Sequence, residues 1–420
     1  MMRLLTGKTL LLLMTLALVM PAYVVAQESE CGQERGKTPG ALDEATWKRL
    51  NDIYEDVGEE EYDSAFNKLE KLNSRARSDY VKAVIAQALA QVEWSRGNFD
   101  TALVNFELAV KLDALPDQTH FALMYQIAQL YYMNERFDEA LNRLALWMCK
   151  VPPEKLTALA YILEASIYAQ KEDWKNVVPA IDTAVSMSED PEETWFQLKL
   201  ASHFELEQFP KVAQTLEIMI QNWPEKKVYW IQLSQVYYKL NLETEALSVL
   251  ALAYRGGMLD KQTDIMYLSS LYSNADIPYK AANVLQKGIE DGVVQVSKRH
   301  WAIVADGWFA AEEMEKALLA YEEAGKAADD GELDLRRAYI LVDMERWGEA
   351  AEAISAALEK DGFNDRKTGE AYVLQGMSKF NLGNYSKAST AWGRASKYPK
   401  TKKSAQQWMN HMREERARKS

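Results

Sequence analysis

Small residues recur along this chain at nearly constant intervals, and each stands between bulky apolar residues. In several places an alanine or valine follows an aromatic residue or methionine by three positions, and in most of them another large side chain comes four positions later. Aligned on this position, the chain contains ten units, marked by Ala65, Ala102, Ala140, Val177, Val212, Ala246, Ala281, Ala317, Ala350 and Ala388. Successive markers are 33 to 38 residues apart.

A second small residue falls twelve positions before the marker in eight units: Ala90, Ala128, Ala165, Ser234, Ser269, Ala305, Ala338 and Gly376. Ile53 and Leu200 stand at this position in the other two units. This pattern predicts two antiparallel helices per unit, which cross closely where both side chains are small. Gly97 and Gly383 fall between the two predicted helices, where glycine supplies the left-handed conformation that ends a helix. An unrelated helical bundle has no reason to keep a near-constant period.

The pattern resembles the tetratricopeptide repeat, whose period is 34 residues. The sixth unit shows it most plainly, with Trp230, Leu233, Ser234, Tyr237, Ala246, Leu250 and Ala253. The resemblance covers residues 43–399. It implies an all-α fold, a right-handed superhelical solenoid of about ten helix–turn–helix repeats.

The segments outside the repeats differ in character. Residues 400–420 begin with Trp408 and Met412 at helical spacing and end in basic residues, so we expect a capping helix with a basic tail. The alternative is that this basic segment is a docking tail. Residues 27–42 are polar and predict an extended lead-in to the first repeat.

Residues 1–26 have the composition of a secretory signal peptide. Arg3 and Lys8 precede a long uncharged stretch, Pro21 interrupts it, and cleavage is expected after Ala26. The alternative is an uncleaved anchor, although the uncharged stretch is slightly shorter than the roughly 20 residues needed to span a bilayer. The protein is therefore expected to be exported.

Two cysteines, Cys31 and Cys149, follow the leader. In an oxidising compartment an even number of cysteines favours a disulfide bond between them. The alternative is two free thiols, with Cys149 acting as a small apolar side chain in a helix.

Charge and motifs narrow the possible functions. The 62 acidic and 49 basic residues give a formal net charge of -13, which disfavours nucleic-acid binding. The sequence contains no glycine-rich phosphate loop, no CxxC and no histidines at metal-binding spacing. We therefore expect no catalytic residues, metal, cofactor or small-molecule substrate, and we expect a protein that binds other proteins. An enzyme whose active site forms only in the fold is a more distant alternative.

Solenoids of this kind bind partners in a groove lined by the first helix of each unit. The twelfth position of the units gives aromatic candidates for this groove: Trp94, Tyr132, Phe204, Tyr238, Phe309 and Phe380. The ninth position gives amides: Gln91, Gln129 and Gln235. Rings supply contact area and amides bind a peptide backbone, so these positions suit a peptide partner. The alternative is that the rings pack between neighbouring repeats.

Beyond the repeat, the chain resembles the exported tetratricopeptide proteins of bacterial TonB energy-transduction systems. The resemblance lies in residues 30–32, 35–39, 174–181 and 229–234, and above all in residues 277–288. It implies a periplasmic accessory whose partners are components such as TonB, ExbB and ExbD. The alternative is a periplasmic scaffold for polysaccharide export, secretion or cell-wall assembly.

Overall fold

The computed structural model describes residue 35 and residues 40–360 and 362–419. Over these residues the chain forms 21 α-helices and no strand. None of these helices combines the length and the apolar composition that crossing a bilayer requires. Residues 1–26 lie outside this part of the chain, so the cleavable leader stays a prediction.

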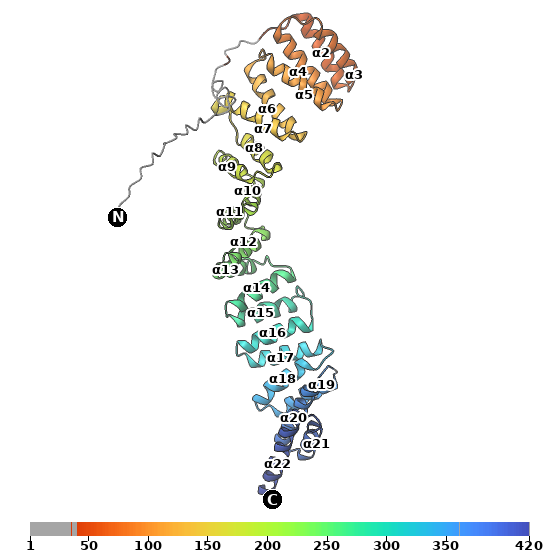
Figure 1. Ribbon diagram of the computed structural model, residues 1–420, viewed down its shortest axis with the longest axis vertical. Coiled ribbons are helices and arrows are strands. Elements are labelled where there is room, and N and C mark those ends of the chain that lie inside the picture. The colour runs from red at the N-terminus through yellow and green to blue at the C-terminus, as the bar shows by residue number, and fades with distance from the viewer. Residues whose placement is uncertain (1–34, 36–39, 361, 420) are drawn as a thin grey trace, which may run out of the picture. The chain divides into compact units, whose positions relative to one another are not determined.

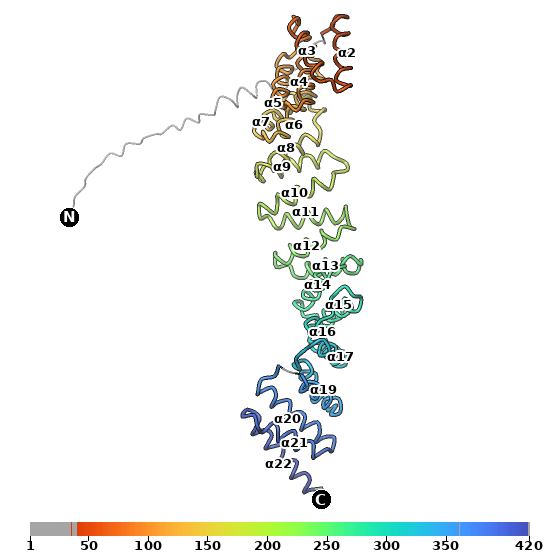
Figure 2. The backbone as a smooth tube through the Cα atoms, turned by 90° about the vertical axis from the view of Figure 1, so that its right-hand side faces the viewer, coloured from red at the N-terminus to blue at the C-terminus, as the bar shows by residue number. Residues whose placement is uncertain are grey.

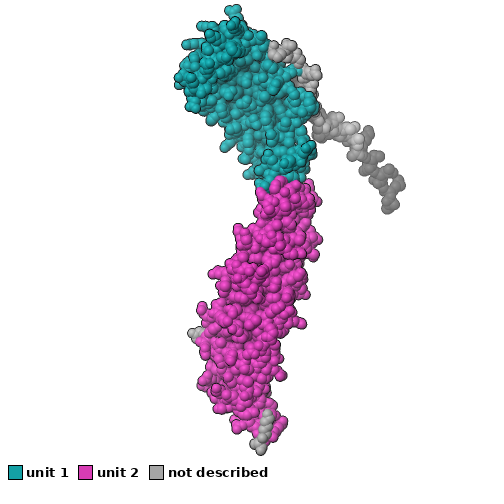
Figure 3. Space-filling view, turned by 180° about the vertical axis from the view of Figure 1, so that it is seen from behind, with its two compact units in different colours: residues 1–208 teal, residues 209–420 magenta. Residues whose placement is uncertain are grey.

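The helices divide between two compact units, residues 1–208 and residues 209–420 (Figure 3). Unit 1 contains α2 (Glu44–Gly58), α3 (Tyr62–Asn73), α4 (Asp79–Ser95), α5 (Phe99–Lys111), α6 (Asp117–Met133), α7 (Phe137–Lys150), the short 3-10 helix η1 (Pro153–Lys155), α8 (Ala158–Gln170), α9 (Trp174–Ser186) and α10 (Glu193–Glu205).

Unit 2 contains α11 (Phe209–Asn222), α12 (Lys227–Lys239), α13 (Glu243–Arg255), α14 (Gln262–Asn274), α15 (Pro278–Glu290), α16 (Lys298–Ala310), α17 (Met314–Lys326), α18 (Glu332–Asp343), α19 (Trp347–Glu359), α20 (Asp365–Asn381), α21 (Tyr385–Ala395) and α22 (Lys402–Lys419).

Within each unit, consecutive helices pack side by side in chain order (Figure 1 and Figure 2). Four complete helix pairs lie in unit 1 and five in unit 2, while α10 ends the first unit and α11 begins the second. All ten marker residues fall in the second helix of their repeat and are at most 2% exposed. The prediction of an all-α solenoid of helix–turn–helix repeats is confirmed.

Where a repeat carries both small residues, they lie at the crossing of its helices, as two repeats show directly. The hydroxyl of Ser234 donates to the carbonyl of Ala246 at 2.8 Å, and Ser269 donates to Ala281 at 2.9 Å. At Gly376 even a methyl group would come within 2.2 Å of the Trp392 indole nitrogen. The close approach inferred from the sequence pattern therefore has a direct steric basis.

The turn between the two helices of a repeat has the same conformation ten times. One residue, five positions before the marker, adopts a left-handed conformation in every repeat: Glu60, Gly97, Glu135, Glu172, Glu207, Asn241, Asp276, Glu312, Glu345 and Gly383. The next amide donates back to a carbonyl five residues earlier, as Arg136 does to Tyr131 at 2.9 Å. This bond closes a Schellman motif and satisfies a carbonyl at the end of the helix. The sequence indicated this turn only at the two glycines.

The last helix, α22, covers the end of the final pair. Trp408 stacks on Trp392 with ring centroids 5.8 Å apart, and Met412 is buried in the same cluster. The helix thus occupies the capping place expected for residues 400–420.

The lead-in contacts unit 1 through Arg35. Its guanidinium donates to Asp113 at 2.7 Å, to Asp117 at 2.9 Å and to the carbonyl of Leu115 at 3.1 Å. Cys149, near the end of α7, is not a free thiol. Cys31 lies outside the described residues, so the bond between these two cysteines stays a prediction.

Candidate functional site

Three of the predicted groove aromatics are half-buried inside their own repeats. Trp94, Tyr132 and Phe380 each contact the aromatic residue five positions later, at the start of the second helix, with centroids 4.5 to 6.1 Å apart. Phe380 also contacts Trp408 of the capping helix. These rings stabilise the fold by packing between the two helices of one repeat. From the sequence, the alternative to a role in the groove was packing between neighbouring repeats.

The other predicted groove residues lie at the surface of first helices. Phe204, on α10, and Tyr238, on α12, are exposed, as is Phe309 on α16. The amides Gln91, Gln129 and Gln235 are exposed on α4, α6 and α12. These residues are divided between the two units, and Phe309 lines a pronounced cleft.

This cleft, of about 650 Å³, lies between α16 and α18 and is called the α16–α18 cleft below. It is lined by Asp306, Phe309, Met314, Tyr321, Arg336, Tyr339, Ile340, Asp343 and Met344. Phe309 and Tyr339 come from neighbouring first helices, so the register of the repeat brings them to the same surface. Their exposed fractions are 45% and 39%, and that of Met344 is 36%.

Polar groups fix one side of the cleft. The Tyr321 hydroxyl donates to Asp306 at 2.5 Å, and Arg336 donates to the same carboxylate at 2.8 Å. Burial and the bond to Asp306 raise the pKa of Tyr321, so its hydroxyl stays a donor at neutral pH. Of the charged residues that line the cleft, Asp343 has no ion-pair partner among the described residues. The carboxylate of Asp343 is therefore available to pair with a cation of a ligand.

A second depression, of about 490 Å³, adjoins the first and shares Arg336 and Tyr339 with it. It extends to α20, where the Tyr339 hydroxyl donates to Glu370 at 3.4 Å. The shared residues join the two depressions into one surface over three successive first helices. An extended or helical peptide segment fits such a surface, because it can place side chains in successive depressions.

Tyr339 was missed by the sequence analysis because it occupies the ninth position, where amides were sought. Tyr54 holds the same position in the first repeat and is exposed on α2, together with Trp47. Counting every aromatic residue at the ninth position, in the same register, would have found Tyr54 and Tyr339.

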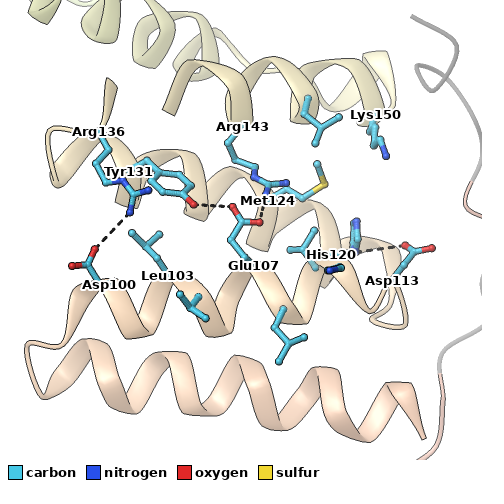
Figure 4. A pocket seen from close by; sticks show the side chains of 15 residues that line it. Asp100, Leu103, Glu107, Asp113, His120, Met124, Tyr131, Arg136, Arg143 and Lys150 are labelled. Carbon is cyan, nitrogen blue, oxygen red and sulfur yellow. Dashed lines mark hydrogen bonds and ion pairs between the residues drawn. The ribbon is translucent and has the colours of Figure 1, made fainter. Parts of the chain in front are cut away.

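Unit 1 has a cleft of a different kind, about 810 Å³ between α5, α6 and α7. Figure 4 shows Arg136 and Arg143 directed at acids of α5. Arg136 lies 3.6 Å from Asp100, and Arg143 pairs with Glu107, which also accepts from the Tyr131 hydroxyl at 3.2 Å. These contacts pair the two arginines with the two acids of α5, so these four side chains are engaged with one another.

His120 lies at the end of this cleft and is 4% exposed. Its Nδ1 is 3.9 Å from Asp113 and has no hydrogen-bond partner among the described residues. Burial, and then the charge of Arg35, lower the pKa of His120 to about 4, so the ring is neutral at pH 7. A neutral imidazole can remain buried at modest cost, and we assign this cleft to the packing of unit 1.

Within the described part of the chain, no three His, Cys, Asp or Glu side chains are arranged to hold a metal ion.

Stacked helix pairs with open depressions over their first helices are the architecture of repeat proteins that bind other proteins. The sequence profile of the tetratricopeptide repeat matches residues 335–404, which include five of the nine residues that line the α16–α18 cleft. Together with the tenfold turn and crossing geometry, this match supports the tetratricopeptide repeat family. No curated protein is similar enough in sequence to count as a relative.

Several solved structures are similar in fold. A tetratricopeptide repeat protein from Parabacteroides merdae is 12% identical, covers 67% of this chain and 93% of its own, and has a TM-score of 0.36. The C-terminal part of a repeat protein from Cytophaga hutchinsonii is 13% identical, with 68% and 99% coverage and a TM-score of 0.33. YrrB, described as having an unusual peptide-binding site, is 16% identical, with 44% and 93% coverage and a TM-score of 0.32. Likenesses of this degree carry no argument about what this chain binds.

Proposed function

We propose that this protein is an exported, periplasmic scaffold that binds a peptide segment of a protein partner along the first helices of unit 2. The observation that carries this proposal is the α16–α18 cleft, where Phe309, Tyr339 and Met344 remain exposed side by side. Clustered apolar and aromatic side chains of this kind mark interaction surfaces, because a partner that covers them removes apolar area from water.

The chemistry of the cleft defines the partner segment. An apolar or aromatic side chain would occupy the space between Phe309 and Tyr339, as anchors do in peptide-binding grooves. The unmatched carboxylate of Asp343 favours a lysine or arginine beside that anchor. A basic and apolar segment is therefore the best match.

We further propose that the partner belongs to a TonB-type system that energises outer-membrane transport. The support is the sequence resemblance, whose segments 229–234 and 277–288 lie on α12 and α15 of unit 2. Export rests on the leader, and the periplasmic site rests on the same resemblance. TonB and ExbD are the components to test first.

The test is a titration of the mature chain with purified periplasmic domains of TonB and of ExbD. The variant Phe309→Ala/Tyr339→Ala should bind roughly thirtyfold more weakly, since truncated hot-spot aromatics commonly cost about 2 kcal/mol. The matched control is Leu252→Ala/Leu319→Ala, which removes two exposed apolar side chains from the second helices α13 and α17 and should bind normally. If the cleft variant binds as tightly as the unmodified chain, the cleft is not the binding site. If the unmodified chain binds neither domain, the TonB role is refuted.

A further inference from the structure

The C-terminal end of the chain is strongly basic although the whole chain is acidic. Residues 385–420 contain ten lysines and arginines and two acids, against a formal net charge of -13 for the chain. The basic residues lie on α21, on α22 and on the loop between them. This end therefore has the opposite charge to the rest of the protein.

In the body of unit 2, many cations are neutralised by an acid one repeat away. Lys227 pairs with Asp260, Lys298 with Asp330, Arg346 with Glu315 and Lys367 with Glu332, each about one repeat length apart in sequence. Lys227 and Lys298 use an acid of the following repeat, whereas Arg346 and Lys367 use an acid of the preceding one. The last repeat has no following repeat and so lacks the first kind of partner. On its first helix Lys367 is neutralised by the preceding repeat, but the cations that follow residue 385 have no such pair across repeats among the described residues.

The basic residues at this end accordingly lack ion-pair partners among the described residues. The side chains concerned are exposed: Lys387, Arg394, Lys397, Lys400, Lys402, Lys403, Arg413 and Arg416. The ion pair that the structure shows here joins Arg418 to Glu415 at 3.5 Å.

Two of these cations line a cleft of about 990 Å³ between α21 and α22. Arg413 and Arg416 face it together with the hydroxyl-bearing residues Ser386, Ser389 and Thr390. Guanidinium groups and hydroxyls are the donors that bind phosphate oxygens, and arginine can donate two parallel hydrogen bonds to them.

We infer that this end of unit 2 binds the surface of an anionic phospholipid bilayer, with lipid phosphates in the α21–α22 cleft. An acidic protein partner is the competing possibility. Tight protein interfaces need a cluster of aromatic or apolar anchors. In this cleft Met412 is buried in the cap and Tyr385 is half-buried with Arg416 over its ring, which leaves Leu382 as the exposed apolar side chain of the lining. Attraction to anionic lipid needs only clustered lysines and arginines near the membrane surface.

Co-sedimentation with lipid vesicles tests this inference. The mature chain should bind vesicles of phosphatidylcholine containing phosphatidylglycerol and leave pure phosphatidylcholine vesicles in the supernatant. Arg413→Glu/Arg416→Glu should weaken binding at least about thirtyfold, because each cation near an anionic surface contributes about 1 kcal/mol. Added salt should weaken binding of the unmodified chain.

The matched control is Lys211→Glu/Lys261→Glu, which makes the same change of charge at exposed positions elsewhere in unit 2. An equal loss in this control would refute a local site. Failure to bind phosphatidylglycerol vesicles, with retention on immobilised polyglutamate, would overturn the inference in favour of an acidic protein partner. The variant Phe309→Ala/Tyr339→Ala should bind vesicles normally, so the outcome is independent of the proposed peptide groove.

Discussion

The left-handed turn residues give a stability prediction. Replacing glutamate by glycine at this turn should stabilise the protein, and replacing glycine by alanine at the equivalent turn should destabilise it. Glu172 and Glu312 adopt φ of 57° and 59°, and Gly97 adopts 80° at the same place in its repeat. Both glutamates are exposed, and none of the described contacts involves their side chains. A methyl group added at Gly97 would meet no atom within 4 Å. Substitutions here therefore change the backbone preference and little else.

The magnitude follows from two opposing terms. A residue with a Cβ in the left-handed conformation costs roughly 1–2 kcal/mol, whereas glycine loses about 0.5–1 kcal/mol more conformational entropy on folding. Glu172→Gly and Glu312→Gly should each stabilise the protein by about 0.5–1 kcal/mol. Gly97→Ala should destabilise it by a similar amount.

Urea unfolding followed by circular dichroism measures these changes as shifts in the midpoint. Glu172→Gln and Glu312→Gln are the controls, because they remove the charge and keep the Cβ. They should leave the midpoint nearly unchanged. If the glycine variants are no more stable than the glutamine variants, or if Gly97→Ala is neutral, the turn conformation does not carry the cost assigned to it.

The remaining predictions concern single sites. Tyr132→Ala should lower the melting temperature, because that ring is half-buried, while Tyr238→Ala should leave it unchanged, because that ring is exposed. The pKa of His120 is about 4 in the folded chain and near 6.5 when exposed, so the unfolded chain takes up a proton first. Thermal stability of unit 1 should therefore fall between pH about 6.5 and about 4, and His120→Gln should reduce that slope. Non-reducing peptide mapping of protein from the periplasm should recover Cys31 joined to Cys149, and two alkylatable thiols would contradict that bond.

The repeat was predictable from sequence because close helix approach requires small residues at fixed positions. Ala246 and Ser234 are conspicuous for that reason, and the structure places them in contact. The turn was predictable only where glycine occurs. At Glu172 the left-handed conformation is imposed by the helices on either side, against the preference of the residue, so local sequence gave no sign of it.

The candidate groove was only partly predictable. Phe309 was found by register, and Tyr339 could have been found in the same way. The cleft itself depends on Tyr321, a residue of a second helix that reaches Asp306 and helps to define one wall. Side-chain positions of this kind arise from contacts between particular side chains of packed helices, which a periodic pattern does not specify.

The same limit applies to the basic end. The excess of lysine and arginine after residue 385 is visible in the sequence. Their lack of partners became visible only when the structure showed which cations in earlier repeats pair with acids of neighbouring repeats. Whether a surface cation has an acidic partner depends on which helices lie next to it in the folded protein.

Site-specific photo-crosslinking in living cells tests the central claim most directly. The photoreactive residue benzoylphenylalanine would replace Phe309 in the α16–α18 cleft and, in a second variant, Leu319 on the second helix α17. The account predicts a discrete crosslinked protein partner from position 309, identifiable by mass spectrometry, and none from position 319. Crosslinks from position 319 with none from position 309 would contradict it and would place the binding surface on the second helices.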